Sequence, residues 1–197
     1  MSWVSPVTLS SDYCTLVPLS LKHHDDLVLA VQDGDLSKLW YAIIPKPDEV
    51  KEDIERRLLL QSEGKMFPFA VINNRTQKAV GVTSYCNVDS VNHRLDIGWT
   101  WYAKSQQRTA LNTTCKLLLL KHAFETLACI AVGFRVDNLN RPSQKAVERL
   151  GARYEGTIRN YCVLRDGNIR DMLFYSILPH EWPRIKSHLT NLMHMHK

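Results

Sequence analysis

The order of apolar and polar positions divides this chain into two halves that meet near residue 103. In the first half, short apolar runs predict four strands, and two segments with apolar residues on one helical face lie between the first strand and the second. The strands are expected over residues 13–19, 67–73, 79–87 and 94–102, and the helices over 21–32 and 48–63. A turn at residues 74–78 predicts that the second and third strands form an antiparallel hairpin.

In the second half, helical and strand patterns alternate. Helices are expected over residues 112–127, 143–150 and 181–192, and strands over 130–136, 153–165 and 170–178. No repeat, low-complexity segment or linker interrupts the pattern. We therefore expect one α+β domain over residues 1–197, with a cofactor-binding core at about 94–156. Its architecture should be three-layered, with helices on both faces of a mixed, mostly antiparallel sheet of about seven strands.

Composition narrows the class of protein. The chain has 197 residues, of which 45% are hydrophobic and 23% charged, as in an ordinary soluble globular protein. No apolar run approaches the ~20 residues that span a bilayer, and the start of the chain lacks the pattern of a signal peptide. Five cysteines without C-x-x-C spacing favour reduced thiols and argue against a zinc site or a disulfide framework. We expect a cytoplasmic protein without a metal site.

The net charge of +5 could suggest a nucleic-acid partner, but the basic residues are scattered and form no recognised motif, so we expect none. Several basic residues instead lie near the predicted helix starts at about 112 and 143. They are Lys104, Arg108, Lys116, Arg141 and Lys145. Such a distribution suits a polyanionic ligand.

A polar loop at residues 105–112 connects the strand 94–102 to the next helix. Free backbone N–H groups gather at such a helix start, and the helix dipole adds positive potential, so a phosphate is favoured there. A plain strand-to-helix connection would look the same from the loop alone. The loop and its neighbours resemble the cofactor-binding half of the GCN5-related N-acetyltransferases, in particular the Rim-type enzymes that acetylate N-terminal amines of ribosomal proteins.

In that family the loop carries the pattern [RQ]-x-x-G-x-[GA], whose amides hold the cofactor pyrophosphate. The resemblance implies the same role for Gln107, Arg108, Thr109, Ala110, Leu111 and Asn112. This chain departs from the pattern at two positions. Ala110 stands where the family has glycine, and Asn112 stands where the family has glycine or alanine. Alanine still allows a helical first turn, and Asn112 can cap the helix that follows.

The family also pairs the end of the preceding strand with the pantetheine arm of the cofactor. The resemblance implies this role for the backbone of Trp99, Thr100 and Trp101, with backbone N–H groups near Thr100 and Trp101 polarising the thioester carbonyl. Pairing with a ligand requires that the neighbouring strand splays away, and Gly98 is the expected position of a bulge. Packing of Gly98 against a bulky neighbour is an equal alternative.

The segment from Asn140 to Ala152 resembles the family pattern N-x-x-[SA], a short helix and L-G-[FA]. This implies that Asn140 contacts the pantetheine amides, although an ordinary helix cap needs no ligand. Val147 stands where many relatives have a tyrosine acid, so the resemblance assigns the acid role to Ser143, as in the Rim-type subgroup. Ser143 would then also contact the cofactor.

Two carboxylates match positions at which relatives place a base, and both could instead be solvated or salt-bridged. They are Asp96, on the strand beside the acceptor, and Glu155 of the pair Glu155-Gly156. Cys162 replaces a further glutamate of the ribosomal-protein enzymes, which puts their acceptor in doubt. The acceptor is expected to lie against the N-terminal helices and the loop with Trp40, Tyr41, Pro45 and Pro47.

The resemblance implies an acetyl-CoA-dependent N-acetyltransferase. The acceptor would be a primary amine, either a protein N-terminus or a small-molecule amine, which attacks directly in a ternary complex. Relatives are commonly homodimers, so a homodimer is compatible with the resemblance. The alternative is a non-catalytic CoA-binding or protein-interaction module with a degenerate acetyltransferase fold. Val147, Ala110 and Cys162 give that alternative its weight.

Overall fold

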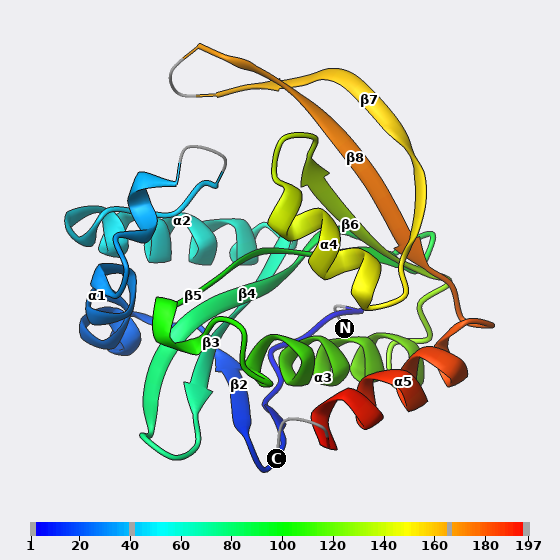
Figure 1. Ribbon diagram of the computed structural model, residues 1–197, viewed down its shortest axis with the longest axis horizontal. Helices are drawn as coiled ribbons and strands as arrows, with labels where there is room; N and C mark the ends of the chain where they lie inside the picture. The colour runs from blue at the N-terminus through cyan, green and yellow to red at the C-terminus, as the bar shows by residue number, and fades with distance from the viewer. Residues whose placement is uncertain (1–2, 40–41, 165–166, 195–197) are drawn as a thin grey trace.

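The computed structural model describes residues 3–39, 42–164 and 167–194. Its centre is one mixed sheet in which eight strands follow the order β1-β2-β3-β4-β5-β6-β8-β7 (Figure 1). The strands are β1 (Leu9–Ser10), β2 (Cys14–Pro18), β3 (Met66–Asn73), β4 (Lys78–Asp89), β5 (Arg94–Tyr102), β6 (Ala131–Asp137), β7 (Arg153–Val163) and β8 (Ile169–Ile177). Neighbouring strands are antiparallel except β5 and β6, which are parallel.

Helices cover both faces of the sheet. One face packs against α1 (His24–Gln32) and α2 (Val50–Ser62), and the other packs against α3 (Leu111–Glu125), α4 (Arg141–Arg149) and α5 (Trp182–His194). Short 3-10 helices lie at Leu21–His23, Leu36–Lys38, Pro47–Glu49 and Lys104–Gln106. In the parts of the chain that the structure describes, no helix is both long and apolar enough to span a membrane.

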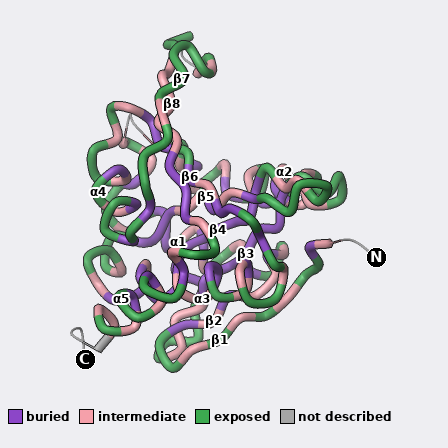
Figure 2. The backbone as a smooth tube through the Cα atoms, turned by 90° about the vertical axis from the view of Figure 1, so that its right-hand side faces the viewer, coloured by how far each residue is buried: buried purple, intermediate pink, exposed green. Residues whose placement is uncertain are grey.

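Two apolar clusters hold these layers together, one on each face of the sheet. The larger joins β-strand residues such as Leu95, Val132 and Ile177 to α3, α4 and α5, whereas the smaller joins α1 and α2 to residues such as Val82 and Trp101. Figure 2 shows the buried positions concentrated in the strands and on the inner sides of the helices. Side chains of β5 therefore pack into both apolar clusters, because neighbouring residues of a strand point to opposite faces of the sheet.

The predicted fold class, a mixed and mostly antiparallel sheet between helices, is confirmed. The strand predicted over residues 94–102 coincides with β5, and the closing helix lies at Trp182–His194. The sheet has one strand more than expected because the two residues of β1 pair with Leu16 and Thr15 of β2. A strand this short has no alternating pattern that a sequence could show.

The β7–β8 hairpin projects from the body of the molecule (Figures 1 and 2). Most of β7 is exposed, because β7 is the outer strand of the sheet and pairs only with β8. Its register shifts between Tyr154 and Gly156, so that Glu155 has no partner across the pair. This irregularity places the Glu155 side chain close to the base of the hairpin.

Candidate cofactor-binding and catalytic site

β5 and β6 separate after three paired residues. The last pair is Asp96 with Gly133, and beyond it β5 has no strand partner on the β6 side among the described residues. β6 continues to Asp137, where it is paired only with β8. Two strand edges with unpaired backbone groups thus face one another. An extended ligand that carries amide groups can hydrogen-bond to such edges as an additional strand would.

A β-bulge lies directly after the point of separation. Two residues of β5, Trp99 and Thr100, stand opposite the single residue Thr83 of β4. Trp99 has a φ of 52°, in the left-handed region that a bulky side chain rarely adopts. The expected bulge is therefore present, with Trp99 next to Gly98 as the residue in the unusual conformation.

Two buried cationic side chains contact this bulge from opposite faces of the sheet. On the α2 side, Arg57 Nη1 donates to the carbonyl oxygen of Trp99 at 3.2 Å and to Ser84 Oγ at 3.2 Å. On the α3 side, Lys116 Nζ donates to Thr100 Oγ1 at 2.9 Å. Thr100 Oγ1 in turn lies 2.8 Å from Thr83 Oγ1. The bulge is thus held by hydrogen bonds on both faces.

The start of α3 offers free amides. No backbone or side-chain hydrogen bond of the described residues uses the N–H groups of Ala110, Asn112 or Thr113. The first turn contains no acidic residue. The prediction that Asn112 caps this helix is wrong, because α3 begins at Leu111, and the hydroxyl of Thr109 accepts the Leu111 N–H instead. The unpaired N–H groups and the helix dipole favour an anion here.

The loop before α3 is tied to the rest of the fold. The Asp33 carboxylate at the end of α1 accepts the Ser105 N–H at 2.9 Å, and the Gln107 amide donates to the carbonyl oxygen of Tyr102 at 3.1 Å. Arg108 is exposed and has a φ of 60°. Leu111 is fully buried, so its side chain anchors the helix start and only its backbone faces the loop.

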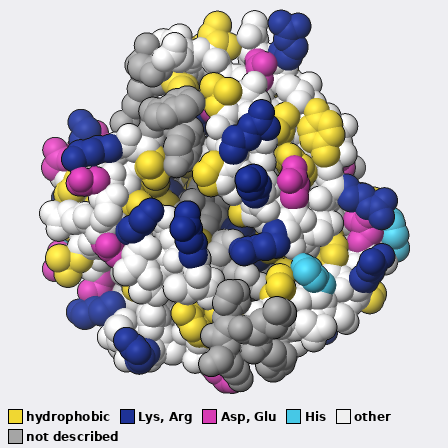
Figure 3. Space-filling view, in the orientation of Figure 1, with side chains coloured by type: hydrophobic (Ala, Val, Ile, Leu, Met, Phe, Trp, Pro, Cys, Tyr) yellow, Lys and Arg dark blue, Asp and Glu magenta, His cyan; other side chains and the backbone are white. Residues whose placement is uncertain are grey.

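Exposed basic side chains surround this region. Figure 3 shows several Lys and Arg side chains in the middle of the face that carries α3 and α4. Of the five basic residues that the sequence placed at the helix starts, four are exposed: Lys104, Arg108, Arg141 and Lys145. The fifth, Lys116, is only 6% exposed and reaches the bulge rather than the surface.

At the start of α4, Asn140 is the N-cap residue, and its Oδ1 accepts the Ser143 N–H at 3.1 Å. The Ser143 hydroxyl is half-buried and makes no hydrogen bond within the described chain. Val147, at the position of the family tyrosine, is buried in the larger apolar cluster. Ser143 thus presents a hydroxyl without a partner among the described residues at the start of α4.

Asp96 forms an ion pair at the point where the strands separate. Its Oδ2 lies 2.6 Å from Arg135 Nε and accepts a hydrogen bond from Asn87 Nδ2 at 2.9 Å. Its carboxylate packs over Gly133, where a Cβ atom would overlap it. Arg135 also contacts the rings of Phe174 and Tyr161. The last strand pair is thus fixed by a carboxylate that already has a cationic partner.

Glu155 lies on the same face of the sheet as Asp96. Gly133 pairs with Asp96 on one side and with Ser176 on the other, and directly paired residues share a face. Ser176 Oγ donates to Glu155 Oε1 at 2.6 Å. This face is the α2 side, whereas α4 with Ser143 packs on the opposite side. The candidate acid and the candidate bases therefore approach the separated strands from opposite faces.

The tryptophan side chains of β5 do not turn toward α4. The indole of Trp99 is 40% exposed and lies under the guanidinium of Arg56, and Trp101 is buried in the cluster with α1 and α2. Only the backbone of these residues can line the unpaired edge.

On the expected acceptor side, Pro45 is buried and Pro47 begins a 3-10 helix, while Trp40 and Tyr41 lie outside the described residues. Cys162 is half-buried on β7, opposite Arg170 of β8.

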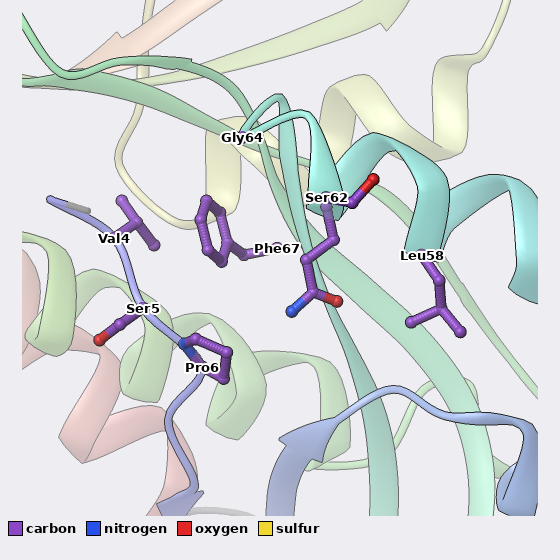
Figure 4. A pocket seen from close by; sticks show the side chains of 8 residues that line it. Val4, Ser5, Pro6, Leu58, Ser62, Gly64 and Phe67 are labelled. Carbon is purple, nitrogen blue, oxygen red and sulfur yellow. The ribbon is translucent and has the colours of Figure 1, made fainter. Parts of the chain in front are cut away.

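A separate hollow of about 470 Å³ lies between the N-terminal arm, the end of α2 and the start of β3. Figure 4 shows its lining, in which Val4 and Pro6 of the N-terminal arm face Phe67 of β3 and Leu58 of α2. It contains no charged side chain. The chemistry described above is therefore not located in this hollow.

A sheet that opens between two parallel strands, beside a helix start with free amides, defines the acetyltransferase class of fold. A family model described as "Acetyltransferase (GNAT) domain" matches residues 14–153 of the chain. The chain therefore belongs to the GNAT acetyltransferases and is an N-acetyltransferase of the RimJ/RimL-like type. Members of this family use acetyl-CoA.

Individual relatives support this assignment. YdaF of Bacillus subtilis (strain 168), whose name assigns it provisionally to the ribosomal N-acetyltransferases, is 33% identical over 108 residues, 52% of this chain. The match covers 55% of that protein, about half its length. A GCN5-related N-acetyltransferase from Brucella melitensis is 26% identical with a TM-score of 0.87, covering 96% of this chain and 86% of that one.

A third structure shows the same fold with ligands. It is the microcin C7 self immunity acetyltransferase MccE in complex with acetyl-CoA and AMP. It is 20% identical to this chain with a TM-score of 0.72, and the match covers 85% of this chain and 93% of MccE. At that identity the likeness concerns the fold alone.

Proposed function

We propose that this GNAT N-acetyltransferase binds acetyl-CoA between β5 and β6 and transfers the acetyl group to a primary amine that attacks directly in a ternary complex. The separation of the two strands after the pair Asp96–Gly133 is the observation that supports this most strongly. It leaves backbone donors and acceptors for an amide-bearing arm, next to a helix start that suits a phosphate.

The residues present fit acetyl-CoA. Free N–H groups at Ala110, Asn112 and Thr113 would hold the pyrophosphate, with charge from Arg108. Gln107, Thr109 and Leu111 would shape this loop, the first through its bond to the Tyr102 carbonyl oxygen. The β5 backbone at Trp99, Thr100 and Trp101 and the α4 cap at Asn140 would line the pantetheine arm. Small Ala110 leaves the helix start accessible.

When bound, acetyl-CoA would supply an activated acetyl thioester. Backbone N–H groups of the bulge, near Thr100 and Trp101, would donate to the carbonyl oxygen as charge develops on it. Ser143 Oγ, at the start of α4, would give a proton to the leaving sulfur.

We assign the base role to Glu155 and a positioning role to Asp96. To accept a proton, Asp96 would have to give up its ion pair with Arg135, whereas Glu155 would give up one hydrogen bond from Ser176. The second oxygen of Glu155 makes no hydrogen bond in the described chain. Glu155 would therefore accept the proton of the amine on the α2 side, directly or through a water.

The side chains on this face of the site are compatible with two classes of acceptor. Arg135 lies over the ring of Phe174, which pairs with Gly156 next to Glu155, and the exposed indole of Trp99 lies under Arg56. The aromatic rings, rather than the guanidinium groups, suit an amine, which can belong to a peptide N-terminus or to a small molecule. A panel should therefore contain peptides with free N-termini, the same peptides with blocked N-termini, and small amines.

Acetyl transfer from acetyl-CoA to this panel, followed by mass spectrometry, tests the proposal. We expect product with at least one free amine, and a fall in kcat of about 100-fold or more in Glu155→Gln and in Ser143→Ala, with acetyl-CoA binding retained. Glu63→Gln, an exposed glutamate after α2, is the matched control and should keep the wild-type rate. Binding of acetyl-CoA without transfer to any amine would instead support the non-catalytic module.

A further inference from the structure

Lys116 is a buried cation without an anionic partner. Its side chain leaves α3, passes into the interior and ends between β4 and β5, where Nζ contacts Thr100 Oγ1 at 2.9 Å and Thr83 Oγ1 at 3.4 Å. Among the described residues no carboxylate lies within ion-pair distance of Nζ. Arg57, the cation on the other face of the bulge, is paired with Asp53 at 2.6 Å.

Burial of this charge is costly to the fold. Removing an ammonium group from water without a counter-ion is unfavourable, and two neutral hydroxyls offset only part of that cost. Burial accordingly lowers the pKa of Lys116 from 10.5 to about 8. The titratable groups that act on it are the thiols of Cys115, on its own helix, and Cys86, on β4. An apolar side chain would fit the interior better, so the lysine calls for a functional explanation.

The place of the charge suggests that explanation. Thr100 belongs to the bulge and to the stretch of β5 that has no partner on the β6 side. We propose that Lys116 is an electrostatic and positioning residue that holds the bulge through Thr100 and stabilises the negative charge released there when the thioester breaks. This inference rests on the proposed function, because it requires the thioester to lie against the bulge.

The charge balance of the transfer defines what Lys116 would neutralise. A bond forms between the amine nitrogen and the acetyl carbon, the carbon–sulfur bond breaks, and its electron pair stays on the sulfur, which carries negative charge until Ser143 protonates it. The amine loses one proton to the base. Lys116 keeps its own proton throughout, so it changes the energy of the charged species but not the stoichiometry. An opposite charge a few ångströms from a thiol favours its ionised form.

Titration of bound CoA tests this without any knowledge of the acceptor. The thiolate of CoA is followed by its ultraviolet absorbance as a function of pH in the complex, with the desulfo-CoA complex as the blank that cancels the protein's own cysteines. We expect the thiol of bound CoA to ionise at a lower pH than free CoA in the wild type. In Lys116→Met the midpoint should rise by ~1 pH unit or more.

Controls separate this inference from the proposed function. Lys121→Met removes the same charge from an exposed position of the same helix and should titrate like the wild type. Lys116→Gln serves as a second variant if Lys116→Met does not fold. Calorimetric binding of CoA and desulfo-CoA is measured for each variant. If the wild type binds no CoA, both the proposed function and this inference are wrong. If CoA binds but its thiol titrates as in free solution, or identically in wild type and Lys116 variants, only the inference is overturned.

Discussion

Replacing Lys116 by methionine should raise the free energy of unfolding at pH 7 by about 1–2 kcal/mol. The lowering of its pKa from 10.5 to about 8 corresponds to a burial penalty of about 3 kcal/mol. Part of the gain is lost because Thr83 and Thr100 lose a hydrogen-bond donor. A linear methionine fills a volume similar to the lysine stem. Urea denaturation of both proteins measures the difference.

The pH dependence of this difference has a definite sign. Because the folded-state pKa of Lys116 lies below the unfolded value, the unfolded chain binds more protons between about pH 8 and 10.5. The wild type therefore gains stability relative to Lys116→Met as pH rises through that window, and the advantage of methionine shrinks. Lys121→Met should show neither effect. A variant that is less stable at pH 7, with a gap independent of pH, would contradict the account of an unpaired buried charge.

Replacing Arg57 by methionine should have the opposite effect and lower the free energy of unfolding by about 3 kcal/mol. Arg57 is 1% exposed, and its loss leaves the largely buried Asp53 with one cationic partner fewer. The Trp99 carbonyl and Ser84 also lose a donor. Trp99, at a φ of 52°, would then be free to relax, so CoA binding should weaken as well.

Arg56→Met is the matched control. Arg56 is the neighbouring residue and contacts the same carboxylate, but its side chain is 36% exposed. An ion pair of this kind contributes about 1 kcal/mol or less. Denaturant unfolding of both variants gives the comparison. If Arg57→Met cost no more than Arg56→Met, the bulge would not depend on the buried arginine.

Much of the fold could be predicted from the sequence because its signals are local. The strand at Arg94–Tyr102 is bounded by polar turns and contains a period-two pattern, and its limits were predicted to the residue. The bulge was expected at Gly98 because glycine relieves backbone strain, yet Trp99 adopts the unusual conformation. What fixes it there is a contact from Arg57, 42 residues away, which no local pattern reveals.

Side-chain pairing was the part that the sequence could not supply. Lys116 was predicted at the helix start as counter-charge, but α3 turns it inward, because positions 115, 116, 119 and 120 all face the interior. Asp96 meets Arg135 only because β5 and β6 are parallel with Asp96 opposite Gly133. Register between strands depends on the whole sheet, and a single-residue slip would move each of these side chains to the other face.

Amide hydrogen exchange with and without acetyl-CoA tests the central claim, that the cofactor lies between the separated strands β5 and β6. The account predicts slower exchange in peptides covering residues 97–102 and 110–113, because backbone groups that are now unpaired would gain partners. Peptides covering β3, at Met66–Asn73, should be unchanged. No slowing at residues 97–102 under saturating acetyl-CoA, or slowing confined to the hollow around Val4 and Phe67, would contradict it.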